Sequence, residues 1–465
     1  MHSQIPILSG SVSTLVLICV IGLAGCVDTP QPSLGLDAGI VAAIDDVISD
    51  YFPSQSAPGV AVLITRDGER VYERAIGRAN LEVNADIGTD SVFRIGSNTK
   101  PFTAAAVPKL VDEGRLSFQD EIGAHLPDYP SHDRSITIKH LLTHTSGISD
   151  FTSIDGFYPR QFVDQSPEDF IEFFKDEPLQ FEPGSQYRYS NSGYFLLGHI
   201  VATVTGMPYS TYLDETFFAP LGMDNTFYDS SRRIVENRAS GYVPEGDGFL
   251  NGKYISNSIP YAAGSLISTV EDLATWYDAV MSGRIVDQAL VEQATSPYRL
   301  EDGSLSCCGY AWFLGDLAGS PVIGHTGGIT GFYSTLVYLP RERVFAAALT
   351  NANWQHFDFE NLAPKLAALA IGKPYFPPIA PAPDVSAAAG IYRSTSGTAI
   401  EIRSKNGALY FVGNNDSEWP LYSTAENQFY NEVEFTTFEF SASENVSFGV
   451  LAAKRHGEPI VYVRE

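Results

Sequence analysis

The spacing of hydrophobic and polar positions changes along the chain. Its first change, from helical to strand-like spacing, predicts a helix followed by two strands. Between residues 37 and 51 apolar positions recur at helical spacing with acidic residues between them, which predicts an amphipathic helix. Segments 59–66 and 70–77 are strand-like runs, and Asp67-Gly68 lies between them. This dipeptide is a strong signal for a tight hairpin. The folded part is therefore expected to open with a helix and a β-hairpin.

The middle of the chain, from about residue 100 to 290, has mainly helical periodicity, which loops rich in Pro and Gly interrupt. Strand-like patterns return later, and an amphipathic segment follows them. These segments are 310–315, 321–328, 333–340 and 344–351 for the strands, and 359–372 for the helix. We expect the early hairpin and the late strands to form one antiparallel sheet flanked by helices, with a helical lobe inserted between them. The sequence thus predicts an α+β fold for residues 37–372.

Composition changes at residues 373–385, where prolines are frequent. Such a stretch cannot sustain a helix or a central strand, so it is predicted to be a semi-rigid linker. Beyond it, residues 386–465 contain short alternating runs, and Asn406-Gly407 marks one hairpin turn. We predict a small all-β C-terminal domain there, either a barrel or a sandwich.

The N-terminal segment has the features of an export signal. Residues 12–25 form an apolar run shorter than the ~18 residues of a membrane-spanning helix, which favours a signal peptide over residues 1–25. No Lys or Arg precedes the run, unlike in most export signals. The run ends in Leu23-Ala24-Gly25-Cys26, which is similar to a bacterial lipobox, where the thiol is lipidated; the alternative is a cysteine that happens to follow small residues. We expect an exported protein, periplasmic or at the cell surface, with a lipid anchor on Cys26 and a tether over 26–36.

Composition limits the possible partners. The chain has 465 residues, of which 44% are hydrophobic, enough for two or three domains with a large core. Its formal charge of −26 would repel phosphate groups, which argues against nucleic acid and anionic lipid surfaces as partners and leaves the lipid anchor as the expected membrane contact. Four cysteines are too few for a disulfide framework. Cys307 and Cys308 are expected to be thiols rather than a strained vicinal disulfide.

Ser97 and Lys100 stand three residues apart before an Ala-rich helical pattern. At this spacing the hydroxyl and the amine share one helix face, where a desolvated, neutral lysine could accept the serine proton. Backbone N–H groups at the helix start would stabilise an oxyanion beside the serine. Taken alone, the pair also fits a serine that caps a helix, because this spacing arises by chance. Pro108 is expected to kink the helix too far from Ser97 to disturb it.

Tyr189 and Asn191 form a second candidate pair. They stand two apart, so in an extended segment both side chains face the same way. Beside a Ser/Lys pair, a phenol whose pKa is lowered by cationic neighbours could relay a proton, and Asn191 could hold a substrate amide or fix the lysine. The alternative is an aromatic packing residue next to an asparagine in a turn.

The stretch His325-Thr326-Gly327-Gly328 begins a late strand pattern. Glycines inside a strand often mark the close approach of another backbone. A substrate could lie along this edge as an added strand, with the Gly328 N–H completing an oxyanion hole. A β-bulge is the alternative explanation.

In this order and at these separations, the three stretches resemble the serine β-lactamase and penicillin-binding-protein superfamily, and specifically its class C-like branch with D-alanyl-D-alanine carboxypeptidases and esterases. Further matching stretches are 136–148, 181–201, 218–223 and 262–276. The resemblance covers roughly residues 37–372. The C-terminal β region is similar to the lipocalin-like domains appended to some members.

The resemblance implies roles for the residues of all three stretches. Ser97 would be the acylated nucleophile, which Lys100 and Tyr189 activate. Asn191 would belong to the substrate-binding motif, and the Ser97 and Gly328 amides would form the oxyanion hole. The strand that lines the site would be His325, Thr326 and Gly327.

One departure bears on the substrate. Where class C β-lactamases usually have a lysine, this chain has His325, and an uncharged histidine is a poorer partner for the carboxylate of a penicillin or a D-alanine terminus. Esterase and peptidase members commonly carry that histidine. The resemblance thus implies a serine hydrolase that acts through a covalent acyl-enzyme on esters or small amides and peptides. A D-alanyl-D-alanine carboxypeptidase or a β-lactamase is the alternative enzyme, and a catalytically silent peptidoglycan-binding or sensor module is the alternative of another class.

Neither a metal nor an organic cofactor is expected, and the predicted partner is a small-molecule or peptide substrate. His140 and His144, four apart, could place two ligands on one helix face, but no glutamate follows the first and the resemblance makes both structural. The chain contains no Gly-x-Ser-x-Gly, which disfavours an α/β-hydrolase. Loops at 150–165 and 230–262 are expected to shape the substrate pocket.

Overall fold

The computed structural model describes residues 35–306, 308–317, 319–353, 359–373, 386–394, 399–405, 407–412, 418–425, 428–431, 436–443, 446–454 and 460–464. The predicted signal peptide with Cys26, most of the predicted tether and linker, Cys307 and Asn406 lie outside these residues. Within the described ranges, no helix is both long enough and apolar enough to cross a membrane.

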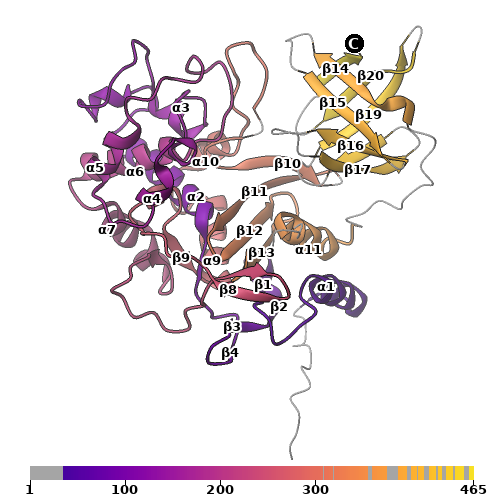
Figure 1. The fold of residues 1–465 in the computed structure, drawn as a ribbon, viewed down its shortest axis with the longest axis horizontal. Helices are drawn as coiled ribbons and strands as arrows, with labels where there is room; N and C mark the ends of the chain where they lie inside the picture. The colour runs from indigo at the N-terminus through magenta and orange to yellow at the C-terminus, as the bar shows by residue number, and fades with distance from the viewer. Residues whose placement is uncertain are drawn as a thin grey trace, which may run out of the picture. The chain divides into compact units, whose positions relative to one another are not determined.

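An antiparallel sheet of six strands forms the centre of the larger part of the fold, in the order β10-β11-β12-β13-β1-β2 (Figure 1). Its strands are β1 (Val60–Arg66), β2 (Glu69–Ile76), β10 (Phe313–Leu317), β11 (Ser320–Ile329), β12 (Phe332–Leu339) and β13 (Val344–Thr350). Strand β1 pairs with β13 from Val60↔Thr350 to Arg66↔Val344. The early hairpin and the late strands therefore share one sheet, as the patterns predict.

The turn between β1 and β2 shows why the sequence has Asp-Gly at this place. Asp67 and Gly68 have φ of +55° and +79°. A two-residue hairpin turn matches the twist of its strands when both central residues have positive φ, which aspartate tolerates and glycine adopts freely.

Helices cover both faces of the sheet, as Figure 1 shows, and the side chains of β1 alternate between the two. Val60, Val62 and Ile64 point into the core formed with α1 (Ala38–Tyr51) and α11 (Leu362–Ala370). Ala61 and Leu63 belong to the core on the other face, where α9 (Val270–Met281) contacts β1 and β13. A strand buried on both faces has a continuous apolar sequence, which is why 59–66 shows no polar alternation.

The predicted helical lobe lies between β2 and β10 in the sequence. Besides α9, its helices are α2 (Lys100–Asp112), α3 (Ile138–Leu142), α4 (Phe157–Arg160), α5 (Pro167–Phe174), α6 (Asn191–Thr205), α7 (Tyr209–Leu213), α8 (Ala219–Leu221) and α10 (Gln288–Ala294). Helix α2 continues through Pro108 to its end. The lobe also contains seven short strands that the sequence patterns did not predict: β3 (Arg78–Asn80), β4 (Ala85–Asp86), β5 (Phe93–Arg94), β6 (Phe227–Tyr228), β7 (Tyr242–Glu245), β8 (Gly248–Asn251) and β9 (Leu266–Ser268). Runs this short contain too few alternations to define a period.

The C-terminal region is a closed antiparallel barrel whose strands follow one another in chain order. They are β14 (Gly390–Ser394), β15 (Ala399–Lys405), β16 (Ala408–Val412), β17 (Glu418–Ala425), β18 (Gln428–Asn431), β19 (Thr436–Ser443), β20 (Val446–Lys454) and β21 (Ile460–Arg464). Pairing of the first strand with the last, at Arg393↔Val463, closes the barrel. Tyr392, Phe440 and Leu451 fill its interior. Of the two predicted all-β arrangements, the structure has the barrel.

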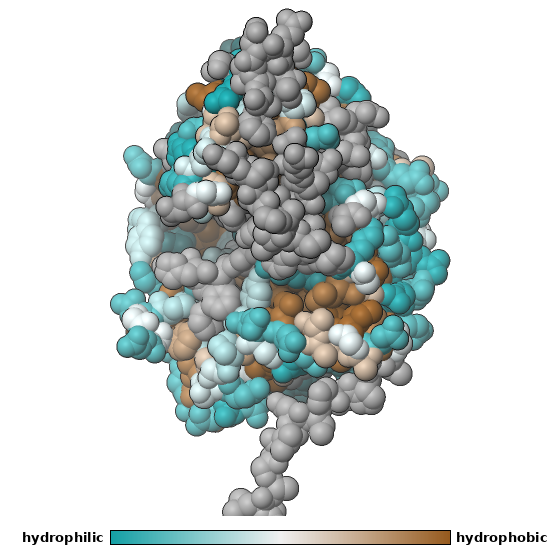
Figure 2. All heavy atoms as spheres, turned by 90° about the vertical axis from the view of Figure 1, so that its right-hand side faces the viewer, coloured by the Kyte–Doolittle hydropathy of each residue, from teal (hydrophilic) through white to brown (hydrophobic). Residues whose placement is uncertain are grey.

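The surface fits the acidic composition. Among the coloured residues in Figure 2, hydrophilic ones predominate at the sides of the face, and the largest group of apolar ones lies below its centre. Large exposed apolar side chains include Val83 and Ile234 in the lobe. In the barrel, Ile391 and Val463 are exposed on the paired strands β14 and β21. Single exposed apolar residues are ordinary on folded proteins and do not by themselves indicate a binding surface.

Candidate active site

Ser97 and Lys100 meet where a short 3-10 turn, η1 (Gly96–Thr99), runs into α2. The Lys100 side chain is 0% exposed. Its Nζ donates to Ser97 Oγ at 3.1 Å, to Asn191 Oδ1 at 2.8 Å and to the Ala263 carbonyl at 2.8 Å. The three acceptors use all three N–H donors of an ammonium group. The alternative of a capping serine does not fit, because the residue before α2 is Thr99 and no side chain caps this helix.

Asp150 determines which atom of Asn191 faces the lysine. One oxygen of the Asp150 carboxylate, Oδ2, accepts hydrogen bonds from the backbone N–H and the Nδ2 of Asn191, each at 2.9 Å. Because the amide nitrogen is held there, Oδ1 turns toward Lys100. Sequence reasoning missed Asp150; the available signal was an acidic residue two positions beyond the matching stretch 136–148.

The burial of Lys100 has an electrostatic consequence. Desolvation lowers the pKa of Lys100 to about 7, and the Asp150 carboxylate raises it by a smaller amount. A neutral amine has two N–H donors, which the Asn191 and Ala263 oxygens engage because these oxygens can only accept. Its lone pair is then left for the Ser97 hydroxyl. This corner can therefore hold a neutral lysine as a base at the serine.

Tyr189 lies beside the same amine, with Lys100 Nζ 4.7 Å from the centre of its ring. The predicted lowering of its pKa is wrong. Burial raises the pKa of Tyr189, a hydrogen bond with Ser97 lowers it only in part, and the charges of Asp150 and Cys308 raise it further. A phenolate in this environment would lose its hydration, which outweighs the attraction of a nearby cation. Tyr189 is thus an uncharged phenol at pH 7, which can relay a proton only by donating its own while it accepts another.

His144 supports Tyr189 from behind. It follows α3 with φ +56°, is 2% exposed, and stacks on the Tyr189 ring at 4.5 Å and 28°. Its Nδ1 accepts the Ser190 N–H at 3.1 Å, and burial lowers the pKa of His144 well below its usual value. His140, by contrast, forms a capping box with Thr137 at the start of α3. The two histidines have separate structural roles, and no group of three or more His, Cys, Asp or Glu within the described ranges is placed to hold a metal ion.

Glycines bring β11 against the turn that carries Ser97. A Cβ on Gly327 would lie 2.0 Å from the Ile95 carbonyl oxygen, and one on Gly96, whose φ is +52°, would lie 2.9 Å from the Gly328 nitrogen. Ser334 of β12 fastens the contact, because its Oγ donates to the Ile95 carbonyl at 2.8 Å and accepts from Asn98 Nδ2 at 2.7 Å. The glycines predicted that another backbone lies close to this strand. At Gly327 that backbone is the protein's own, at Ile95.

Of the four motif residues, only Gly328 borders the cavity that opens at Ser97; His325, Thr326 and Gly327, which the resemblance implied would line the site, are not among its lining residues. His325 stacks on Phe313 at 4.5 Å and 19°, and its ring centre is 6.2 Å from that of Tyr189. Its Nδ1–H donates to the carbonyl of Thr326 at 2.5 Å. Burial, with a smaller effect of Lys100, lowers the pKa of His325 to about 3. The ring is uncharged at pH 7, as the residue type predicted.

A cavity of about 270 Å³ opens beside Ser97. Its apolar wall consists mainly of Phe151, Phe157, Ile255, Ile259 and Ile329. Gly328 and Asn191 also border it. The two loops that were expected to shape the pocket supply the first four of the apolar side chains. No Lys, Arg or His is among the described residues that line this cavity.

Comparison with known proteins places the chain in a family. The family model described as "Beta-lactamase" matches residues 42–371. Penicillin-binding protein 4* of Bacillus subtilis (strain 168) is 27% identical over 426 residues, which are 83% of this chain and 92% of that protein.

Solved structures show the same fold. The octameric penicillin-binding protein homologue from Pyrococcus abyssi superposes with a TM-score of 0.64 at 24% identity, over 90% of this chain and 99% of that one. The D-amino acid amidase from Ochrobactrum anthropi SV3, in complex with D-phenylalanine, has a TM-score of 0.62 at 27% identity, over 72% of this chain and 99% of that one. With a family model that spans most of its length, this chain belongs to the beta-lactamase family, whose relatives here include a penicillin-binding protein and an amidase.

Proposed function

We propose that this protein is a serine hydrolase that forms a covalent acyl-enzyme on Ser97 with uncharged esters or small amides and peptides. The observation that carries the proposal is the position of Lys100. It is fully buried, its Nζ is 3.1 Å from Ser97 Oγ, and burial lowers its pKa to about 7. Burying a lysine costs folding free energy, and a base at a nucleophile is a function that accounts for this cost.

The first half of the reaction follows from these contacts. Ser97 Oγ attacks the substrate carbonyl carbon while its proton passes to Lys100, with Tyr189 as an uncharged relay between the hydroxyl and the leaving group. The N–H groups of Ser97 and Gly328 stabilise the oxyanion. The C–O or C–N bond then breaks, and the leaving group takes the proton.

In the second half, a water molecule attacks the acyl carbon of the ester on Ser97. The same base accepts a proton from the water, and Ser97 recovers its own proton as the acid product leaves. Ser97, Lys100 and Tyr189 carry out these steps while Asn191 holds Lys100 in place, so the proposed mechanism uses no metal or organic cofactor.

The cavity supports the choice of substrate. Its side chains are mainly apolar and the described lining residues include no cation, while His325 is uncharged. A carboxylate entering such a site would lose hydration without gaining a charged partner. An uncharged apolar acyl group is therefore favoured over a penicillin or a D-alanine terminus. The D-alanyl-D-alanine carboxypeptidase or β-lactamase remains the second candidate, which the penicillin-binding relative favours.

Two further proposals concern the rest of the chain. Residues 37–372 would form the hydrolase domain and residues 386–465 the appended domain, which the family match over 42–371 and the barrel from Gly390 to Arg464 support. We also propose export and lipidation at Cys26, which the apolar run and the small residues before it support. Labelling of the protein by a fatty acid in cells, lost in Cys26→Ser, would test the anchor.

Intact mass of the full chain tests the reaction. The protein is exposed to a penicillin or to an activated short-chain ester, with Ser97→Ala alongside. We expect fast ester turnover that depends on Ser97, and no lasting penicillin adduct. A stable penicilloyl adduct on Ser97 would support the peptidase instead. If neither adduct nor turnover appeared, the silent binding module would be the better assignment. Turnover by Ser97→Ala would contradict the mechanism.

A further inference from the structure

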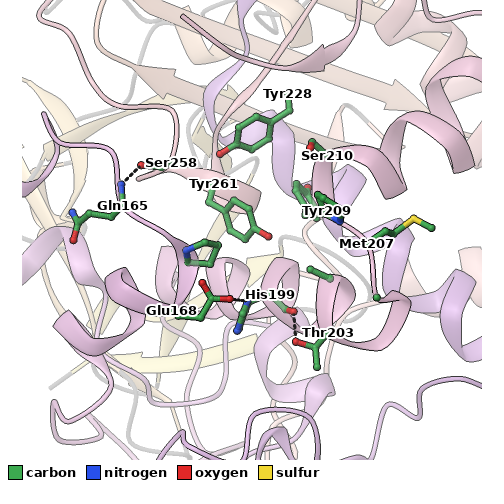
Figure 3. Close-up of a pocket in the computed structure, with 14 residues that line it drawn as sticks. Gln165, Glu168, His199, Thr203, Met207, Tyr209, Ser210, Tyr228, Ser258 and Tyr261 are labelled. Carbon is green, nitrogen blue, oxygen red and sulfur yellow. Dashed lines mark hydrogen bonds and ion pairs between the residues drawn. The ribbon is translucent and has the colours of Figure 1, made fainter. Parts of the chain in front are cut away.

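A second, larger cavity shares a wall with the first. It has a volume of about 570 Å³, within the range of small-molecule sites, and Figure 3 shows the residues around it. Ser258 and Tyr261 face this cavity, whereas Ile259, Pro260 and Ala263 face the cavity at Ser97. One segment, residues 258–263, thus separates the two cavities and contributes residues to the wall of each.

Three tyrosine rings form much of the wall of the second cavity. Figure 3 shows Tyr261 in the middle of the view, Tyr228 above it and Tyr209 to its right. The ring centres of Tyr209 and Tyr228 lie 5.2 and 6.1 Å from that of Tyr261. Their hydroxyls are engaged within the protein, those of Tyr209 and Tyr228 at 2.6 Å with Thr103 Oγ1 and the Asn257 carbonyl. The rings are therefore held in place, and because Tyr209 and Tyr261 are only 1% and 8% exposed, they present a small and mainly apolar surface at the cavity wall.

A carboxylate stands at the edge of this aromatic wall. Glu168, in the first turn of α5, lines the cavity with a side chain that is 68% exposed, and its Oε1 is 3.8 Å from His199 Nδ1. Burial lowers the pKa of His199 despite this carboxylate, so the imidazole does not neutralise it near pH 7. Burial raises the pKa of Tyr261, and Tyr209, Tyr228 and, least of all, Glu168 raise it further. No Lys or Arg is found among the described lining residues.

We propose that this second cavity binds a small aromatic amine, with its ring against the wall that the tyrosines form and its ammonium group toward Glu168. Aromatic faces attract both apolar rings and cations, and the unneutralised carboxylate selects a cation over an anion. The formal charge of −26 raises the local concentration of cations around the whole protein. The site is separate from the one at Ser97, and its ligand regulates turnover there.

The shared segment explains how the two sites are coupled. Tyr261 and Ala263 belong to one 3-10 turn, η5 (Tyr261–Ala263), and the Ala263 carbonyl accepts the hydrogen bond from Lys100 at 2.8 Å. Tyr261 has φ +43°, a left-handed conformation that is unfavourable for a residue with a side chain. A ligand that contacts the Tyr261 ring thus acts on a strained turn that positions the proposed base, and it changes the geometry at Lys100.

Binding is measured by calorimetry on the full chain with 2-phenylethylamine, and with 2-phenylethanol as the uncharged analogue. We expect saturable binding of the amine, about fivefold tighter than the alcohol because the carboxylate is largely exposed to solvent. Ser97→Ala, which does not touch the second cavity, is expected to bind the amine equally well. Equal affinity for amine and alcohol would overturn the assignment of Glu168.

Three variants locate the site. Glu168→Gln is expected to lose the preference for the amine, whereas Glu172→Gln, on the same helix but outside the cavity lining, keeps it. Ala202→Phe places a large side chain in the cavity and is expected to abolish binding. Unchanged affinity in a folded Ala202→Phe would overturn the proposal; if this variant did not fold, the two glutamate variants decide.

Ester hydrolysis tests the coupling. At saturating amine we expect kcat to change by about fivefold, with no competitive rise of KM. A KM that rises in proportion to the amine, at constant kcat, would place the amine at Ser97 and overturn the proposal. Bound amine with unchanged kinetics would contradict the coupling through η5. Because binding is measured independently of turnover, the second site can be tested even if the proposed hydrolase activity fails.

Discussion

The two faces of the six-stranded sheet bury side chains of different character. Against α1 and α11 the buried groups are mostly apolar, and the amine of Lys365 there, 8% exposed, reaches the Tyr51 hydroxyl at 2.7 Å. On the lobe side, Lys100 is 0% exposed and Asn98 and His144 are also buried.

The α1/α11 face contributes mainly to stability, whereas the lobe face contains the groups proposed for catalysis. Apolar burial is favourable wherever the pattern of the chain allows it. Burial of Lys100 and His144 is costly, and it lowers the pKa of both; that of Lys100 falls to about 7, where a lysine can act as a base. The lobe face is therefore where substitutions should alter turnover more than folding, and the α1/α11 face is where the reverse should hold.

The largest effect on turnover is expected for Lys100→Met, which keeps most of the side-chain volume and removes the base. Turnover of an activated ester at pH 8 should fall about 10³-fold. Steady-state kinetics measures the loss, and thermal denaturation checks that the variant is folded. A folded variant that keeps more than about a tenth of the wild-type rate would show that Lys100 is not the base.

Gly327→Ala should have the next largest effect. Its Cβ would meet the Ile95 carbonyl oxygen and push β11 away from the turn that carries Ser97. A displacement of about 1 Å at the reacting groups corresponds to roughly a 10²-fold loss of kcat/KM. Gly123→Ala is the matched control, since nothing lies within 4 Å of an added Cβ there. Equal activities of the two variants would contradict the importance of this contact.

A smaller effect is expected in the pH profile. The base must be neutral, so kcat/KM should rise with pH through a midpoint near the pKa of Lys100, which burial lowers to about 7. The Asp150 carboxylate raises that pKa, so Asp150→Asn should move the midpoint to lower pH while still accepting the Asn191 N–H groups. A midpoint that stayed in place, or moved upward, would argue against Lys100 as the titrating group.

The smallest effect on turnover is expected for a substitution on the α1/α11 face of the sheet. Leu366→Ala in α11 removes a fully buried side chain from the α1/α11 core and should lower the free energy of unfolding by about 3 kcal/mol. Chemical denaturation measures this loss. At a temperature where the variant is folded, kcat should match the wild type; a tenfold loss would mean that the two faces are not independent.

The fold was largely predictable because its elements have strong local signals. The Asp67-Gly68 turn, the apolar run of β1 and the late strands β11 to β13 each carry a pattern that does not depend on distant residues. The short strands of the lobe could not be predicted in this way. For example, β5 pairs with β9 at only two positions, Phe93↔Ser268 and Arg94↔Ile267. Such short pairings form because tertiary packing brings the segments together.

The sequence predicted which residues make up the candidate site, but not the pKa shifts of their side chains. The spacing of Ser97 and Lys100 already placed them together, and the structure does so. The expected direction at Tyr189 was wrong because a pKa depends on burial, and burial is a property of the whole fold. Asp150 was missed for a similar reason, since it contacts Asn191 across 41 positions of sequence.

By itself, the sequence determined the helix, the hairpin, the late strands and the order of the motif residues, because these depend on the period of side chains and on local backbone preferences. Only the tertiary structure decided that Lys100 would be buried from solvent, that Asp150 would orient Asn191, and that residues 258–263 would separate two cavities. Desolvation and hydrogen-bond partners come from residues far apart in the chain, and no local pattern records which of them will meet.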